Sequence, residues 1–144
     1  MKLGRLNHIG VATPSIADSV AYYRKVMGAV EVSEPFDMAE QGVKVCFVDT
    51  PNGGTQIELI EPLSPESPIH GFLAKNPLGG QHHVCFEVPG IEEARAHFEG
   101  LGARILGPTR IGAHGTPIFF LHPKDMMGVL TEIMEMPRGG QDGH

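Results

Sequence analysis

Two histidine–glutamate pairs have the residue types and the spacing for metal or acid–base chemistry. His8 and Glu58 form the first pair, and His83 and Glu132 form the second at an offset of 75 and 74 residues. All four lie in or beside apolar runs that are typical of strands. A charged side chain buried in such a run is costly unless it is paired or bound to a metal. Two imidazoles and two carboxylates suit Mn, Co, Zn or Ni.

The same four residues also have an ordinary structural explanation. A single strand histidine is more often a hydrogen-bonded core or edge residue than a ligand, and a single strand glutamate more often faces water. The repetition of both pairs favours a shared role, but spacing alone leaves both explanations open. His82 and His83 must point to opposite faces of a strand. Because the repeat selects His83, we expect His82 to be structural or to lie at the rim of a site.

Weaker candidates lie in the C-terminal part of the chain. His114 belongs to the stretch Ile-Gly-Ala-His-Gly at 111–115, and glycine lets a loop approach a ligand closely. The stretch His-Pro-Lys-Asp at 122–125 is typical of a tight turn between the last two strands. Its Lys124 would meet an anion only if the turn lies near a cleft. We assign no role to His70, His97 and His144.

An internal repeat supplies the elements that would position these residues. Residues 8–16 and 83–91 share His, a β-branched residue, Pro and Ile in register. Ser15 and Gly28 are expected to cap the first helix at its two ends. The first half is predicted to contain strand Leu6–Ala12, helix Ser15–Val26 and strands Ala29–Ser33, Val43–Val48 and Gln56–Ile60. The second half is predicted to contain strand His82–Val88, helix Ile91–Leu101 and strands Ala103–Leu106, Pro117–Leu121 and Val129–Met134.

These elements predict an α+β fold with tandem βαβββ repeats. A single βαβββ unit leaves one apolar sheet face uncovered. Two units are therefore expected to form a curved eight-stranded sheet around a metal-binding cleft. We expect one domain over 1–136, with a first half at about 5–61, a linker at 62–80 that includes a short helix Ile69–Lys75, and a second half at about 81–136. Residues 137–144 have no apolar content and are expected to form a disordered tail.

Composition excludes several partners. The formal net charge is −6, which argues against nucleic acid because phosphate binding needs a basic face. Cys46 and Cys85 each lie in a Val-Cys-Phe run and are expected to be reduced core residues. The sequence shows no targeting leader and no apolar run long enough to span a membrane. We therefore expect a cytoplasmic protein with no membrane partner.

The sequence resembles the vicinal oxygen chelate superfamily, which includes glyoxalase I and the extradiol dioxygenases. Within it, the chain is similar to the methylmalonyl-CoA epimerases from Leu6 to about Glu135. Five stretches carry the resemblance: Leu-Asn-His-Ile at 6–9, 67–76, Gly-Gly-Gln-His-His at 79–83, 111–115, and 120–132 beginning Phe-Leu-His-Pro-Lys-Asp. The middle and the last of these are typical of the epimerases rather than of the superfamily.

The resemblance implies a chemistry for the four residues. It implies a homodimer that acts in propionate metabolism on a small CoA thioester, by proton removal and return at C2 through an enolate. It also implies a divalent metal (Co, Mn, Zn, Ni or Mg) held by His8, His83 and Glu132, with Glu58 at the position of the fourth ligand. In one branch of the family a second catalytic glutamate aligns with Val45. Because valine cannot act as a base, the catalytic pair is expected to be Glu132 and Glu58.

The CoA contacts and the alternatives are less closely defined by the sequence. Arg110, Lys124 and His114 are the expected substrate-binding residues. One alternative is a glyoxalase I-type lyase that acts on a glutathione hemithioacetal, and another is a non-catalytic ligand-sequestering protein of the same fold. A dioxygenase is disfavoured because it would need Fe(II) and an aromatic substrate, whereas this chain has no Trp and two Tyr.

Overall fold

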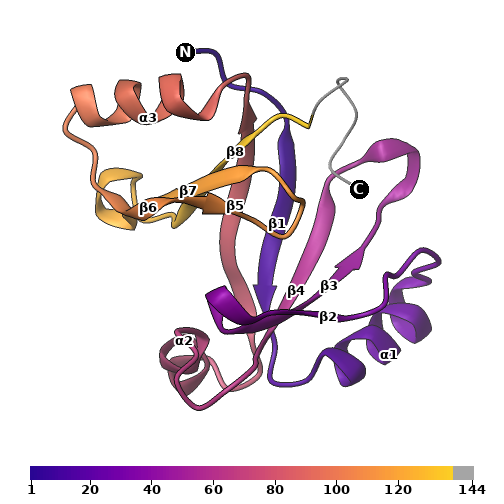
Figure 1. Ribbon diagram of the computed structural model, residues 1–144. Helices are drawn as coiled ribbons and strands as arrows, with labels where there is room; N and C mark the ends of the chain where they lie inside the picture. Colours follow the sequence, from indigo (N-terminus) through magenta and orange to yellow (C-terminus); the bar gives the residue numbers. More distant parts are fainter. Residues whose placement is uncertain (138–144) are drawn as a thin grey trace. The chain divides into compact units, whose positions relative to one another are not determined.

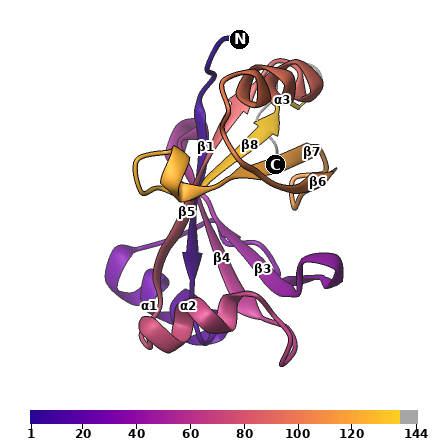
Figure 2. The same ribbon diagram turned by 90° about the vertical axis from the view of Figure 1, so that its left-hand side faces the viewer.

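The computed structural model describes residues 1–137. The described chain divides into two compact units, of which one spans Ile9–His82 and the other joins Met1–His8 to the chain from His83 onward. Strand β1 (Leu6–Ala12) therefore contributes to both units. Figure 1 shows the path of the chain, and Figure 2 shows it turned by 90°.

The unit Ile9–His82 is built on an antiparallel sheet. Strand β3 pairs with β2 on one side and with β4 on the other, with Phe47 opposite Glu58. Helix α1 packs its Ile16 side chain into a core that includes Cys46 and Leu59. The elements of this unit beyond β1 are α1 (Ile16–Met27), β2 (Phe36–Met38), β3 (Val43–Val48), β4 (Gln56–Pro62) and α2 (Ile69–Lys75), with 3-10 turns η1 (Ala39–Gln41) and η2 (Pro51–Gly53).

The other unit contains the second repeat. Strand β5 pairs in parallel with β8, and β8, β7 and β6 follow as antiparallel neighbours. Helix α3 packs against β6, β7 and β8 (Figures 1 and 2). Its Ile91 and Ala94 side chains lie in a core with Phe119. The elements are β5 (Gly80–Val88, from His83 onward), α3 (Ile91–Gly100), β6 (Ile105–Ile111), β7 (Pro117–Leu121), η3 (Pro123–Asp125) and β8 (Thr131–Glu135).

Hydrogen-bonded strand neighbours follow the order β2-β3-β4-β1-β5-β8-β7-β6. Each half has the strand–helix–three-strand succession that the repeat predicts, and α2 lies between them. The predicted α+β class with eight strands is therefore confirmed. The assignment of 1–136 to one domain remains a prediction.

A glutamate from the last strand holds the first turn of the helix in each half. The Ile16 N–H donates to Glu61 Oε1 at 2.6 Å, and the Ile91 N–H donates to Glu135 Oε1 at 3.0 Å. Such bonds satisfy a helix-end donor and place negative charge at the positive end of the helix dipole. Ser15 also caps α1 by accepting from the backbone N–H three residues later, whereas the N-cap residue of α3, Gly90, offers no side chain.

The predicted strand Ala29–Ser33 is wrong, and the second strand of the first half is β2. Residues 29–33 make only one isolated bridge, Val32 to Val48. The Ser33 hydroxyl accepts from the Phe47 N–H, so a side chain ends the backbone ladder there. Pro35 follows and has no N–H to donate. Regular pairing with β3 resumes only at Phe36.

The predicted strand Ala103–Leu106 is also displaced, because β6 continues to Ile111. Its pairing with β7 shifts register between Leu106 and Arg110, where Gly107 and Pro108 interrupt the ladder. Glycine and proline are typical turn residues, which is why the sequence indicated an end of the strand here. The chain instead passes through a bulge and pairs again.

Both cysteines are free and fully buried, as predicted. Burial raises the pKa of the Cys46 thiol, which disfavours the reactive thiolate. Among residues 1–137, none of the helices is long and apolar enough to cross a membrane. The predicted disordered tail lies outside the described residues, apart from Pro137.

Candidate metal centre

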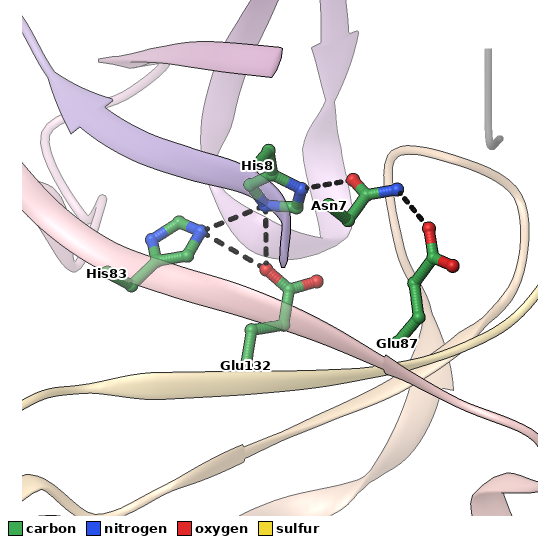
Figure 3. Close-up of polar contacts among 5 residues, drawn as sticks. All are labelled: Asn7, His8, His83, Glu87 and Glu132. Atoms are coloured by element: carbon green, nitrogen blue, oxygen red, sulfur yellow. Dashed lines mark hydrogen bonds and ion pairs between the residues drawn. The ribbon is translucent and has the colours of Figure 1, made fainter. Parts of the chain in front are cut away.

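Three of the four predicted ligands converge within the unit that contains the second repeat. His8 comes from β1, His83 from β5 and Glu132 from β8, and all three are at most 5% exposed. Figure 3 shows the two imidazoles turned toward the Glu132 carboxylate. The parallel pairing of β5 with β8 places Cys85 opposite Glu132. Strand β1 and the first and last strands of the second repeat, β5 and β8, therefore bring three of the predicted residues together.

The three ligand atoms form a nearly equilateral triangle. His8 Nε2 lies 3.3 Å from His83 Nε2, and each of these nitrogens lies 3.1 Å from Glu132 Oε1. Ligands bound about 2.0–2.2 Å from one metal lie about 3.0 Å apart at right angles and about 3.4 Å apart at tetrahedral angles. The observed edges lie between these values. The arrangement fits one face of a metal coordination sphere.

Hydrogen bonds among neutral groups do not account for all three edges. His8 Nδ1 lies 2.7 Å from Asn7 Oδ1, and a neutral imidazole carries only one N–H. If that proton is on Nδ1, His8 Nε2 presents a lone pair to both His83 and Glu132. Lone pairs at this distance repel unless positive charge lies between them. A divalent cation satisfies all three groups at once, so this buried His/Glu cluster could hold a metal.

The electrostatics keep Glu132 ionised. Burial raises the pKa of its carboxyl, but without a metal the imidazoles of His8 and His83, when protonated, attract and hydrogen-bond the carboxylate and hold its pKa well below its usual value. The carboxylate is thus available as a metal ligand. Oε1 makes the contacts with both imidazoles, and Oε2 points away from them in Figure 3.

A series of hydrogen-bonded polar side chains, which the sequence does not reveal, lies behind His8. Asn7 Nδ2 donates to Glu87 Oε2 at 2.9 Å, and Arg5 Nε lies 3.2 Å from the same oxygen. Asn7 is fully buried and Glu87 is 3% exposed. The sequence shows Asn7 and Glu87 as polar residues within the strands β1 and β5. It does not show their pairing, because 80 residues separate them.

His114 lies beside the triangle, and its role in substrate binding remains a prediction. Its ring stacks on His8 with centroids 5.0 Å apart and an interplanar angle of 20°. Phe120 packs edge-on against His83 at 5.3 Å. The rings of His114 and Phe120 therefore flank the two imidazoles. His114 lies in the loop between β6 and β7.

Glu58 and Val45 belong to the unit Ile9–His82. Glu58 lies on β4 and is 6% exposed, so a carboxyl group is buried at the position that the repeat predicts. Val45 is 1% exposed on β3, opposite Ile60. Its aliphatic side chain has no group that could act as a base.

Arg110 and Lys124 are exposed, and their contacts are local. Arg110 lies opposite Ile118 on β7, and Lys124 donates its backbone N–H to His122 Nδ1 in the η3 turn. The turn is braced by an ion pair at 2.8 Å between Arg104 and Asp125. The predicted turn is confirmed, while CoA contacts by Arg110 and Lys124 remain predictions.

The other histidines have structural contacts. His82 packs edge-on against Phe72, in line with the structural role expected of it. His70 contacts the Ser64 carbonyl oxygen, and His97 packs against Phe98. His144 lies outside the described residues.

Comparison with known proteins defines the class. A family model described as Glyoxalase/Bleomycin resistance protein/Dioxygenase superfamily matches residues 7–120, so the fold and the His/Glu cluster occur in a member of that superfamily. The ethylmalonyl-CoA/methylmalonyl-CoA epimerase of Cereibacter sphaeroides is 49% identical over 93% of this chain and 99% of its own length. The mitochondrial methylmalonyl-CoA epimerase of Bos taurus is 50% identical over 91% of this chain and 74% of its own length. The chain belongs to the methylmalonyl-CoA epimerase family.

A solved structure agrees with this assignment. A variant of the Streptomyces coelicolor methylmalonyl-CoA epimerase in complex with 2-nitronate-propionyl-CoA superposes with a TM-score of 0.83. It is 37% identical, and the match covers 93% of this chain and 98% of that one. The glyoxalase-like fold and the family that the sequence predicted are both confirmed.

Proposed function

We propose that this chain interconverts (2R)- and (2S)-methylmalonyl-CoA by taking the C2 proton from one face and returning a proton to the other. The observation that carries the proposal is the buried triangle of His8, His83 and Glu132 in a chain of this family. The C2 proton lies between a thioester carbonyl and a carboxylate. Its removal leaves an enolate, whose negative charge a site must stabilise.

His8, His83 and Glu132 would hold a divalent metal, with Glu58 as the fourth protein ligand. Such a metal supplies Lewis-acid stabilisation of negative charge on substrate oxygens, worth several kcal/mol. Imidazole and carboxylate ligands together suit Co, Mn, Zn or Ni better than Mg, which prefers oxygen ligands. Burial of Glu58 in β4 supports its place in the set.

Glu132 and Glu58 would carry the protons. Each lies in the last strand of its repeat and is at most 6% exposed. With Oε1 turned to the imidazoles, Glu132 has Oε2 for a proton. A positioned acid or base typically contributes about 10²–10⁴-fold to the rate. Stacked on His8, His114 would border the bound acyl group, while Arg110 and Lys124 would supply cations for the CoA phosphates.

The chain would act as a cytoplasmic homodimer in propionate metabolism. Its formal charge of −6 disfavours nucleic acid as a partner. Size-exclusion chromatography with light scattering would measure the molar mass and so test for the dimer.

The test is exchange at C2. Methylmalonyl-CoA of 2R configuration is incubated in D₂O with protein and Co²⁺ or Mn²⁺, and then with EDTA in excess. We expect loss of circular dichroism with deuterium appearing at C2 in proton NMR, and EDTA should stop both. Glu132→Gln is the matched control, since it keeps the shape of the side chain and removes the carboxylate.

Two other outcomes would replace this proposal. Turnover of methylglyoxal with glutathione, without exchange in methylmalonyl-CoA, would assign a glyoxalase I-type lyase. Stable binding of an unchanged ligand by metal-free protein would assign a sequestering role.

A further inference from the structure

A series of hydrogen-bonded polar side chains leads from His8 away from the metal triangle. His8 Nδ1 contacts Asn7 Oδ1 at 2.7 Å, Asn7 Nδ2 contacts Glu87 Oε2 at 2.9 Å, and Arg5 Nε lies 3.2 Å from that oxygen. Figure 3 shows Asn7 between the imidazole and the carboxylate. Asn7 is fully buried and Glu87 is 3% exposed. Burying these groups is costly unless each is hydrogen-bonded.

Only one assignment of donors and acceptors is consistent for the side chains that run from His8 through Asn7 and Glu87 to Arg5. The Glu87 carboxylate accepts, and the Arg5 guanidinium can only donate to it. The Asn7 side chain must therefore turn its NH₂ toward Glu87 and its oxygen toward His8. An oxygen at that position accepts only, so the neutral His8 ring carries its proton on Nδ1. Its Nε2 lone pair is then directed into the triangle.

Backbone hydrogen bonds hold Arg5 and Glu87 together at the end of this series of side chains. The Gly4 N–H donates to the Glu87 carbonyl at 2.7 Å, and the Glu87 N–H donates to the Arg5 carbonyl at 3.0 Å. A Cβ on Gly4 would lie 2.6 Å from the Glu87 carbonyl oxygen, so this approach requires glycine. The N-terminal segment thereby holds Arg5 beside the Glu87 side chain.

The second repeat does not reproduce this arrangement. The residue before His83 is His82, which packs against Phe72. The amide of Asn7 is therefore a feature of the first ligand strand and not a general requirement of the βαβββ unit.

We propose that Asn7 and Glu87 are positioning residues that fix the tautomer and ring orientation of His8, so that its Nε2 is preorganised to bind a divalent metal. The inference rests on the proposed metal site and deepens it. Partners of this kind behind a ligating histidine orient the ring and raise its basicity, and their loss typically weakens metal binding by about 10–100-fold.

The first experiment measures the tautomer in metal-free wild-type protein. At a pH at which the His8 ring is neutral, long-range ¹H–¹⁵N NMR of histidine-labelled protein should show a protonated Nδ1 and an unprotonated Nε2. His8→Gln identifies the signal. A proton on Nε2 with Nδ1 bare would overturn the inference, whatever the protein does with metal.

The second experiment exchanges the amide and the carboxylate. Asn7→Leu removes both hydrogen bonds and should weaken Co²⁺ and Zn²⁺ binding about 10–100-fold in chelator competition. The double variant N7D/E87Q restores both hydrogen bonds with almost no change in shape, because Asp accepts from His8 and Gln donates to Asp. It should recover most of the lost affinity and keep the proton of His8 on Nδ1.

The control separates positioning from loss of stability. Glu135→Gln weakens the cap of α3 in the same unit and should leave the metal Kd unchanged. If Asn7→Leu binds metal as tightly as the wild type, Asn7 does not position His8. If the double variant binds no better than Asn7→Leu, the hydrogen-bond pattern is not the cause. If the wild type binds neither metal while His8 keeps its proton on Nδ1, the metal proposal fails and the tautomer assignment stands.

Discussion

The last strands of the two repeats, β4 and β8, carry the same pattern in different surroundings. Both contain two glutamates with two apolar residues between them, at 58–61 and 132–135. In each, the first glutamate is buried and the second accepts from the first N–H of the helix in the same half. The helices nevertheless begin differently, with Ser15 for α1 and Gly90 for α3. The repeat has preserved these long-range contacts more closely than the local cap.

The largest effects should come from the first glutamate of each strand. Glu132→Gln should lose metal and reduce C2 exchange by more than about 10²–10⁴-fold, the usual contribution of one acid or base. Glu58→Gln should keep metal, because the triangle of His8, His83 and Glu132 stays intact, and lose most of the exchange. Metal content by mass spectrometry and C2 deuterium by NMR measure both. Near-wild-type exchange in Glu58→Gln would break the equivalence of the two strands.

The second glutamates should differ in their effect on stability. Glu135→Ala should lower the free energy of unfolding by about 2 kcal/mol, since a bond to a charged group is lost and Gly90 provides no other side-chain cap. Glu61→Ala should cost about 1 kcal/mol, because Ser15 still caps α1. Urea unfolding monitored by circular dichroism measures both. Equal losses would mean that the Ser15 cap does not support α1.

Changes at the caps themselves should be smaller. Ser15→Ala should destabilise by about 1 kcal/mol, whereas Gly90→Ser should stabilise by a few tenths of a kcal/mol. Gly90 has an extended backbone, and a Cβ there would meet nothing within 4 Å. The same urea curves provide the measurement. A loss of stability in Gly90→Ser would show that α3 does not begin in the way that α1 does.

The smallest effect should be on stability at low pH. The turn before β8 is expected to make the free energy of unfolding depend on pH, and the turn before β4 is not. Hydrogen bonds from Arg104 lower the pKa of Asp125 from 3.8 to about 2. Because the folded pKa is depressed, this contribution to stability is present above about pH 4 and is lost as the pH falls through about 2. The difference in unfolding free energy between wild type and Arg104→Gln should shrink over that range. A difference independent of pH would exclude the ion pair as its cause.

The turn before β4 supplies the matched control. There the Asp49 carboxylate accepts from the neutral Gln56 side chain at 2.7 Å. Gln56→Leu should therefore not remove the acid dependence that Arg104→Gln removes.

The sequence was informative where periodicity and turn residues agreed. The bounds of β1, α2, β3 and β7 were predicted as observed, because Pro, Gly or Asn lies within three residues of each end. The repeat also singled out His8, His83 and Glu132 as candidates, because offsets of 75 and 74 residues relate chemically similar residues. These predictions needed only local pattern and self-similarity.

The errors arose where one contact between distant residues decided the outcome. The Ser33 hydroxyl ends one strand by accepting a hydrogen bond from the Phe47 N–H. Strand β6 continues past its bulge because β7 pairs with it both before and after the bulge. The link from Asn7 to Glu87 joins two strands 80 residues apart. No local pattern contains such information, since each residue alone is an ordinary polar side chain.

The close approach of Gly4 to Glu87 has a consequence for handling the protein. Two backbone hydrogen bonds join residues 4 and 5 to the backbone of Glu87, and one ion pair joins Arg5 to its carboxylate behind His8. An affinity tag or a cleavage scar that pulls this segment away would therefore alter the metal content of a preparation without touching a ligand. A fusion partner at the N-terminus needs a spacer that leaves Gly4 and Arg5 in place, and batches made with different tags should be compared by metal content before activity.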